Sequence, residues 1–271
     1  ENVFKTGAVN VIYGSAEGLT IAGNQLFYQD TPGIMDSSEQ GDHFGSCLAA
    51  GDFNNDGFDD LAVGVPEEDI ENVDDAGAVN IIYGSSSGLT ILGNQLWRQD
   101  AGGIVGSAES RDWFGSSLAA GDFDNDGFDD LAIGVPYEDI GTTSDAGVVN
   151  IIYGSTTGLS GTGNQMWSQG VAGITGFPES EDLFGRSLAA GDFNNDGFDD
   201  LAVGVANEDI EEILDAGVVN IIFGAGSGLT ATGNQMWSQA VGGIAGGAAS
   251  DDCFGASLSY IPPPSPSNPK K

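Results

Sequence analysis

The sequence has 271 residues, of which 41 are acidic, 6 are basic and 40% are hydrophobic, and its formal net charge is −35. This apolar content is sufficient to bury a core, which argues against wholesale disorder. The acidic excess excludes nucleic acid and anionic membranes as expected partners, because phosphate binding requires clustered Lys and Arg side chains. The sequence contains no run of about 18 apolar residues, so we expect no transmembrane segment.

The chain begins without Met or a signal peptide, which indicates a processed or trimmed N-terminus.

Two patterns near the N-terminus return through the whole chain at a constant spacing. The segment AVNVIYGSAEGLT starts at residue 8, and its relatives start at residues 78, 148 and 218. The segment GNQLFYQ starts at residue 23, and its relatives start at residues 93, 163 and 233. A step of 70 residues without insertion identifies a repeat protein.

Each repeat contains four strand-like runs, which we name A, B, C and D in chain order. The runs FGSSLAAGD, DLAIGVP and GVVNIIYG of the second full repeat illustrate the first three strands. NQLWRQD in the first full repeat illustrates the fourth, because it alternates polar and apolar positions around Trp97. Gly-rich turns separate them, and no stretch carries helical periodicity. Four antiparallel strands repeated radially are the plan of a β-propeller blade. A stacked solenoid is the competing architecture, but this repeat is long for one. We therefore predict an all-β propeller.

The repeats do not fill the chain evenly. The sequence predicts a partial blade (1–43), three full blades (44–113, 114–183 and 184–253), a lone A strand (254–260) and a Pro-rich tail (261–271). A ring closed by the two ends would contain a blade with strands A, C and D but no strand B. That blade is defective, belongs to a longer array, or is completed by a neighbouring molecule. We predict that the chain alone does not close a regular four-bladed ring.

The connection between strands A and B carries an acidic decapeptide in each full repeat. It reads GDFNNDGFDD at 51–60, GDFDNDGFDD at 121–130 and GDFNNDGFDD at 191–200. Counted from the first Asp, side-chain oxygens stand at positions 1, 3, 5 and 9, a Gly at position 6 permits a sharp turn, and a Phe at position 7 offers its carbonyl. Hard oxygen ligands in this number suit Ca²⁺. The predicted ligands are Asp52, Asn54, Asp56, Phe58 and Asp60; Asp122, Asp124, Asp126, Phe128 and Asp130; and Asp192, Asn194, Asp196, Phe198 and Asp200.

Two other interpretations of these loops are weaker. An EF-hand requires a Glu at position 12, where this sequence has Val63, and helices on both sides. A plain Asx-rich turn requires no metal, but its crowded carboxylates would repel one another without a cation. The pattern also occurs three times. We therefore predict three calcium sites, whose expected affinity fits an extracellular, secreted protein.

The combination FGSSLAAGDFDNDGFDDLAIGVP at 114–136 resembles the FG-GAP repeat of integrin α-subunits and their bacterial relatives. The dipeptide Phe-Gly is present in all four copies, and GVP or GVA stands where the family has GAP. The resemblance covers nearly the whole chain to about Tyr260. It implies a propeller with calcium in the A–B loops. The family closes seven blades, whereas this chain holds fewer than four, and no residue here matches the integrin ligand site.

The repeat also separates scaffold residues from candidate recognition residues. Trp97, Trp167 and Trp237 recur at one position and are predicted to pack between blades rather than to form a sugar platform. The variable segments lie between strands B and C, as at 67–77, and between strands D and A, as at 100–113. We expect them to share the face opposite the calcium loops, where a selective ligand would bind.

Catalysis has little support in the sequence. His43 is the only histidine, and other repeats place Trp, Leu or Cys at its position, so no Ser-His-Asp or Cys-His arrangement forms except around it. Carboxylate pairs alone leave a glycosidase open, but the close pairs lie in the predicted calcium loops. We therefore predict a non-enzymatic module.

Two functions follow from these observations. The first is an adhesion or recognition module for a protein or glycan, and the alternative is a structural surface protein that self-associates through its terminal strands. A disulfide between Cys47 and Cys253 is a further prediction, since a closed ring would bring the first and last A strands together.

Overall fold

The computed structural model describes residues 4–171 and 173–261 and contains fourteen strands. No helix occurs within those two ranges. The first sheet has two strands, β1 (Val9–Ser15) and β2 (Gly18–Phe27). Three four-stranded sheets follow. They comprise β3 (Leu48–Gly51), β4 (Asp60–Val65), β5 (Ala78–Tyr83) and β6 (Thr90–Trp97); β7 (Ser117–Gly121), β8 (Asp130–Val135), β9 (Val148–Tyr153) and β10 (Ser160–Trp167); and β11 (Phe184–Gly191), β12 (Asp200–Val205), β13 (Val218–Phe223) and β14 (Thr230–Trp237).

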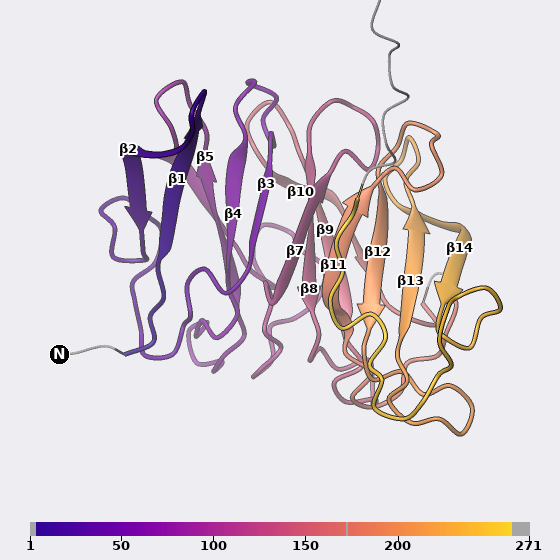
Figure 1. The fold of residues 1–271 in the computed structure, drawn as a ribbon. Coiled ribbons are helices and arrows are strands. Elements are labelled where there is room, and N and C mark those ends of the chain that lie inside the picture. Colours follow the sequence, from indigo (N-terminus) through magenta and orange to yellow (C-terminus); the bar gives the residue numbers. More distant parts are fainter. Residues whose placement is uncertain (1–3, 172, 262–271) are drawn as a thin grey trace, which may run out of the picture.

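Each four-stranded sheet is an antiparallel meander in which neighbours in the chain are neighbours in space. The registers repeat from sheet to sheet, as the pairs Leu61↔Ile82 and Leu131↔Ile152 illustrate. Figure 1 shows the sheets side by side in chain order, from β1–β2 to β11–β14. The predicted all-β architecture of propeller blades is confirmed. The three sheets fall within the three predicted full repeats, although the unit boundaries themselves stay predictions.

The hydrophobic core lies between neighbouring sheets. One cluster joins side chains of the first four-stranded sheet, such as Ile81, to side chains of the second, such as Ile133, and both are fully buried. A second cluster joins the second and third sheets in the same way. Burying a side chain of this size stabilises the folded state by roughly 1.5–3 kcal/mol. Each blade therefore depends on its neighbours for stability.

The tryptophans pack as the sequence predicted where a following blade is present. Trp97 and Trp167 are buried, and the indole N–H of each donates to a Gln two residues earlier in its strand at 3.2 Å. Trp237, in the last sheet, is 39% exposed. The difference reflects the missing neighbour, because all three side chains occupy the same position of their sheets.

The FG motif fixes the close approach of adjacent blades. Phe114 is fully buried, and its N–H donates to the carbonyl of Ala76 in the preceding blade at 2.9 Å. A Cβ on Gly77 would lie only 2.4 Å from the carbonyl oxygen of Phe114. Gly115 adopts φ +90°, a conformation that favours glycine. The motif therefore combines a buried anchor with a turn that side chains would block.

The lone A strand predicted at 254–260 is not formed. Phe254 still donates its N–H to the carbonyl of Ala216 at 2.9 Å, as Phe114 does to Ala76, but the segment forms turns and irregular structure. A strand requires a hydrogen-bonded partner, and no strand B faces this segment among the described residues. β1 and β2 pair with each other and not with 254–260. The prediction that the chain alone closes no four-bladed ring is confirmed. The tail at 262–271 lies outside the described residues.

The predicted disulfide is wrong, because Cys47 and Cys253 are both free. The thiol of Cys47 donates to the carbonyl of Gly115 in the next blade at 2.8 Å, and burial raises its pKa to about 12. Cys253 instead lies against the third four-stranded sheet, where its N–H donates to the carbonyl of Asp215 at 3.0 Å. The bridge depended on a closed ring, and β1 and β2 do not pair with the segment at 254–260.

Candidate metal centre

The acidic decapeptides form the turns between the first and second strands of the three four-stranded sheets. In the second sheet, Asp122 accepts the N–H groups of Asp126 and Gly127 at 3.0 Å each. Asn125 and Gly127 both have positive φ, at +55° and +94°. These bonds wind the loop tightly around the first carboxylate, as the Asx and Gly residues of the sequence predict.

This winding brings three carboxylates of the second loop together. Oxygen atoms of Asp122, Asp124 and Asp130 lie within 4.8 Å of one another. Asp126 lies outside that group of three, and its carboxylate accepts the N–H of Phe128 at 3.0 Å. Burial, followed by the neighbouring charge of Asp126, raises the pKa of Asp124. Three crowded acidic groups without a basic partner are an arrangement that a cation would stabilise.

Asp130 anchors this cluster to the sheet. Its two carboxylate oxygens accept the N–H groups of Phe123 and Gly154, both at 2.9 Å. Burial raises the pKa of Asp130 to about 8, although these two hydrogen bonds oppose the shift. Its counterparts behave in the same way, because burial raises the pKa of Asp60 to about 6 and also raises the pKa of Asp200. The ninth position of each loop is therefore a buried carboxyl that backbone N–H groups hold in place.

The first and third loops repeat this geometry with one change of charge. Asp56 donates its N–H to Asp52 at 3.0 Å, and Asp196 donates to Asp192 at 3.1 Å. The third position is an asparagine in both loops, so the amide oxygen of Asn54 or Asn194 replaces a carboxylate. An amide oxygen is also a calcium ligand, but it contributes no negative charge. The second loop is therefore the most acidic of the three.

The donor set of each loop consists of oxygen atoms. One loop would supply a cation with five or more ligands. Positions 1, 3 and 9 offer three carboxylates, or two carboxylates and one amide. Position 5 adds a further carboxylate, and position 7 adds the Phe carbonyl. Ca²⁺ takes 6–8 oxygens in flexible geometry, so water would complete the shell. The residues present fit calcium, and the assignment of the fifteen ligands stays a prediction.

The structure adds a residue that the ligand pattern missed, at position 8 of each loop. Asp129 accepts the N–H of Asp52 in the preceding loop at 2.8 Å and donates its own N–H to the carbonyl of Asp52 at 3.1 Å. Asp199 makes the same two bonds to Asp122 at 3.2 and 3.0 Å. Position 8 is Asp in all three copies, and this repetition is the sequence signal that could have identified the residue. These aspartates connect the candidate metal loops of adjacent blades.

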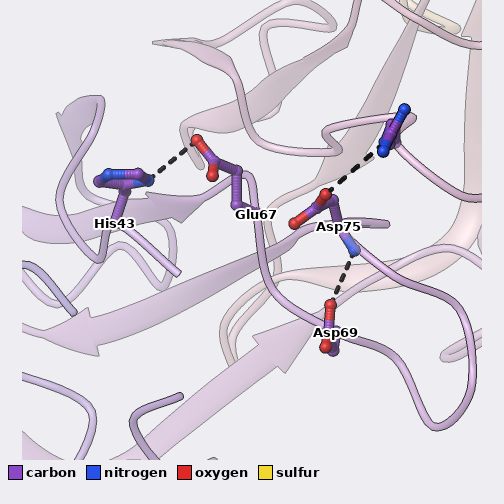
Figure 2. Close-up of polar contacts among 5 residues, drawn as sticks. His43, Glu67, Asp69 and Asp75 are labelled. Carbon is purple, nitrogen blue, oxygen red and sulfur yellow. Dashed lines mark hydrogen bonds and ion pairs between the residues drawn. The ribbon is translucent and has the colours of Figure 1, made fainter. Parts of the chain in front are cut away.

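The variable segments meet at the other end of the sheets, as predicted. The N–H of Trp113 donates to the carbonyl of Asp75 at 3.4 Å, so a D–A connection contacts a B–C connection. In this region His43 Nδ1 lies 2.9 Å from Glu67 (Figure 2). Arg111 Nε lies 4.0 Å from Asp75. In the next blade Trp113 takes the position of His43 and packs edge-on against Tyr137 at 4.7 Å. The same position thus contacts a carboxylate in one blade and an aromatic ring in another.

The family model for the FG-GAP repeat matches residues 44–81, 114–151 and 184–222. The chain is an FG-GAP repeat protein. The matched ranges begin at Phe44, Phe114 and Phe184 and contain the three acidic loops. Each FG-GAP repeat therefore covers the first two strands and most of the third strand of a four-stranded sheet.

The FG-GAP repeats are shared with proteins of two different names. The chain is 30% identical to integrin alpha-3 of Cricetulus griseus over 191 residues, which is 70% of this chain and 16% of that protein. It is 28% identical to integrin alpha-3 of Mus musculus over 225 residues, or 80% of this chain and 20% of that protein. It is 34% identical to phosphatidylinositol-glycan-specific phospholipase D of Rattus norvegicus over 160 residues, or 59% of this chain and 18% of that protein. The chain thus spans a fifth or less of these relatives.

None of the residues that the structure describes belongs to a helix of the length and hydropathy needed to cross a bilayer.

Proposed function

We propose that this chain is a calcium-stabilised recognition module of an extracellular protein and that it binds a protein or glycan. The observation that carries this proposal is the division of each blade into a constant end and a variable end. The A–B loops are nearly identical in sequence, whereas the B–C and D–A segments differ between blades and share one surface. Function in repeat folds commonly resides in such variable loops on a constant scaffold.

Calcium has a structural role in this proposal. Bound at the A–B loops, the cation would neutralise carboxylates that otherwise repel one another and would fix the end of each blade. Asp129 and Asp199 would transmit this order to the neighbouring loops through their bonds to Asp52 and Asp122. The affinity expected of such loops is met by extracellular calcium and not by resting cytosolic calcium, which is why we propose an extracellular location.

The proposed module is not an enzyme. The catalytic alternatives require a base near a nucleophile or a free carboxylate pair, and the only histidine of the sequence contacts Glu67 on the variable surface. Some relatives, including the protein of Rattus norvegicus, are named as a phospholipase D, but the match covers 18% of that protein. Assay of the purified chain against a glycosylphosphatidylinositol substrate tests this part of the proposal, and turnover above a buffer control would contradict it.

A loop exchange tests the recognition surface. Residues 141–144 (Gly-Thr-Thr-Ser) are replaced by the Glu-Asn-Val-Asp of the equivalent residues 71–74. The fold should tolerate this exchange, because Gly141 has φ +67° and Glu71 already adopts φ +59° at the equivalent position. We expect the melting temperature to stay within about 2 °C, as for surface substitutions that cost under about 0.5 kcal/mol, while binding to the ligand is lost or redirected.

The measurement is binding of the purified chain to arrays of extracellular-matrix proteins and of glycans, in calcium and in EGTA. The parent chain should bind a defined subset of probes in calcium, and the exchanged variant should bind a different subset or none. An identical binding pattern for the two chains would refute the assignment of the variable surface, and no binding by the parent chain would refute the recognition function.

Self-assembly is a second candidate function, and the exposed faces of the end sheets favour it. Leu19 is 79% exposed, whereas the equivalent Leu159 and Leu229 are 3% and 2% exposed because a preceding blade covers them. Ile12 is 51% exposed, whereas the equivalent Ile152 is fully buried between strands. An uncovered blade face on one copy would therefore fit the uncovered face at the other end of a second copy.

Light scattering after size exclusion distinguishes this candidate from a monomeric module. If copies associate through the β1–β2 face, Leu19→Asp should reduce the measured mass to that of a single chain. Leu92→Asp is the matched control, because Leu92 is 83% exposed within a complete blade, and it should leave the mass unchanged. A single-chain mass for the parent protein at all concentrations would refute self-assembly.

A further inference from the structure

A second set of polar residues joins the blades, at the end of the sheets opposite the acidic loops. Gln29 donates its side-chain N–H to Glu68 at 2.6 Å, and the equivalent pairs Gln99–Glu138 and Gln169–Glu208 bond at 2.8 Å each. Each Gln follows the last strand of one blade, and each Glu follows the second strand of the next blade. We call these three contacts the seam pairs. They are unrelated to the candidate calcium ligands.

The seam pairs are buried and leave one acceptor without a partner. Gln99 is 1% exposed and Glu138 is 8% exposed. The amide nitrogen of each seam Gln is bonded to the Glu, but Oε1 of Gln29, Gln99 and Gln169 has no hydrogen-bond partner among the residues that the structure describes. Oε1 of the equivalent Gln239, which no seam glutamate faces, is unpaired as well. Buried polar atoms are almost always paired, so the same orphan at three seams requires an explanation.

The surroundings of each seam pair contain many acceptors and few donors. The carboxyl of Asp112, which is 2% exposed, lies at hydrogen-bonding distance from Glu138, and the charges of Glu109 and Asp139 are also close. At the next seam Glu208 faces Asp182, Glu179 and Asp209. The contacts between basic and acidic side chains found within the described residues, His43–Glu67 and Arg111–Asp75, include none of the three seam glutamates. Additional acceptors cannot satisfy an unpaired oxygen, whereas an additional proton can.

We propose that each seam pair holds one proton, so that Glu68, Glu138 and Glu208 are neutral carboxylic acids in the folded protein in mildly acidic solution. The proton comes from water and returns to water when the acid ionises. The protonated oxygen becomes a donor toward the orphan amide oxygen or the adjacent aspartate. The other carboxyl oxygen continues to accept the N–H of the Gln. The contact between blades is therefore tightened by acid.

The electrostatics of the seams agree with bound protons. Burial, with neighbouring carboxylates, raises the pKa of Glu138 and of Glu208 to about 7. Burial also raises the pKa of Glu68 to about 9, with contacts to Asp36 and the charge of Asp42 as further causes. Asp36 is peculiar to the first seam, because the other repeats have glycine at its position, as at Gly106. The first seam should therefore retain its proton to the highest pH.

The direction of the pH dependence follows from these shifts. An acid whose folded-state pKa lies above its unfolded value of 4.5 stabilises the fold fully below pH 4.5. That stabilisation is lost as the pH rises, because the unfolded chain has released the proton that the folded chain still holds. The loss is complete above a pH of about 7 at the two later seams and above about 9 at the first.

The test uses Glu138→Gln, since glutamine has the shape of the neutral acid and carries its own donor. Melting temperatures are measured in saturating calcium from about pH 5 to about pH 8, the range in which the bound proton is lost. We expect the variant to melt roughly 2–4 °C higher than the parent near pH 8, to match it near pH 5, and to show a flatter profile between them. A lower melting temperature near pH 8 would overturn the proposal, because it would mean that an ionised Glu138 is the better partner of Gln99.

Glu109→Gln is the matched control, because it removes one negative charge beside the seam from an exposed side chain. It should flatten the pH profile much less than Glu138→Gln does, because burial is the largest cause of the shift and the titrating acid is retained. An equal flattening by the control would also overturn the proposal, since charge repulsion through space would then suffice. Infrared difference spectra provide a direct readout: the carbonyl band of a protonated carboxylic acid should be present near pH 5 in the parent and reduced in Glu138→Gln. Equal bands in both chains would refute a proton on Glu138.

Discussion

Removal of calcium is expected to lower the melting temperature of this protein by about 10 °C or more. At about 1 mM free Ca²⁺ and a site Kd of roughly 10–100 μM, each loop contributes about 1.4–2.7 kcal/mol, and three loops contribute about 4–8 kcal/mol. For a chain of this size, one kcal/mol corresponds to a shift of about 2–4 °C. The decrease should appear in EGTA, recover with Ca²⁺ and recover poorly with Mg²⁺, whose octahedral preference does not suit the loops. An unchanged melting curve in EGTA would refute the metal sites.

Two substitutions in the second loop provide the matched comparison. Asp124→Asn converts GDFDNDGFDD into the GDFNNDGFDD of the other two loops, so this variant should still bind three calcium ions. Asp130→Ala removes the carboxylate that Phe123 and Gly154 hold in place, so this variant should bind two. Isothermal titration calorimetry counts the ions. Three ions bound by Asp130→Ala would show that the ninth position is not a ligand.

Substitution of one glycine is expected to destabilise the protein strongly while the equivalent glycine tolerates the same change. A Cβ on Gly154 would lie 2.5 Å from the carbonyl oxygen of Asp129 and 2.6 Å from the Cβ of Phe128, both on the acidic loop of the same sheet. The adjacent segments cannot separate without breaking the bond from Gly154 to Asp130 and the bonds between Asp129 and Asp52 of the preceding loop. Gly154→Ala should therefore lower the free energy of unfolding by roughly 1–3 kcal/mol.

Gly14 occupies the same position of the repeat in the partial blade, and nothing lies within 4 Å of its added Cβ. The partial blade has no A–B loop to crowd it. Gly14→Ala should therefore change the free energy of unfolding by less than about 0.5 kcal/mol, as is usual for surface substitutions. Urea unfolding of the two variants measures the difference, and similar losses for both would contradict the packing explanation.

The repeat, the strands and the acidic loops were all predictable from the sequence, because each depends on local patterns. The step of 70 residues and the alternation of strand and turn residues predicted three four-stranded sheets, and these are present. The Asx and Gly residues of the decapeptides predicted tight acidic turns, and Asp122 accepts the backbone bonds of such a turn. Residues that are close together in the sequence determine these features, so the features form wherever the repeat occurs.

Contacts between blades could not be predicted from these local sequence patterns. The position of Asp129 falls outside the alternation of metal ligands, so its bonds to Asp52 of the preceding loop became visible only in the folded chain. The same holds for Gln99 and Glu138, which are 39 residues apart and meet because consecutive blades pack side by side. The predicted bridge between Cys47 and Cys253 failed for the same reason, since it assumed a closed ring.

Equivalent residues of different repeats have similar local sequences, but their surroundings in the folded chain differ. Leu19 and Leu159 follow the same Gly in the same hairpin, yet one is 79% exposed and the other 3%. The segment at 254–260 repeats the FG motif but forms no strand, because a strand is stable only when another strand satisfies its backbone groups. The sequence determines what each blade can form, and the presence of a neighbouring blade determines which of its residues are buried, paired or strained.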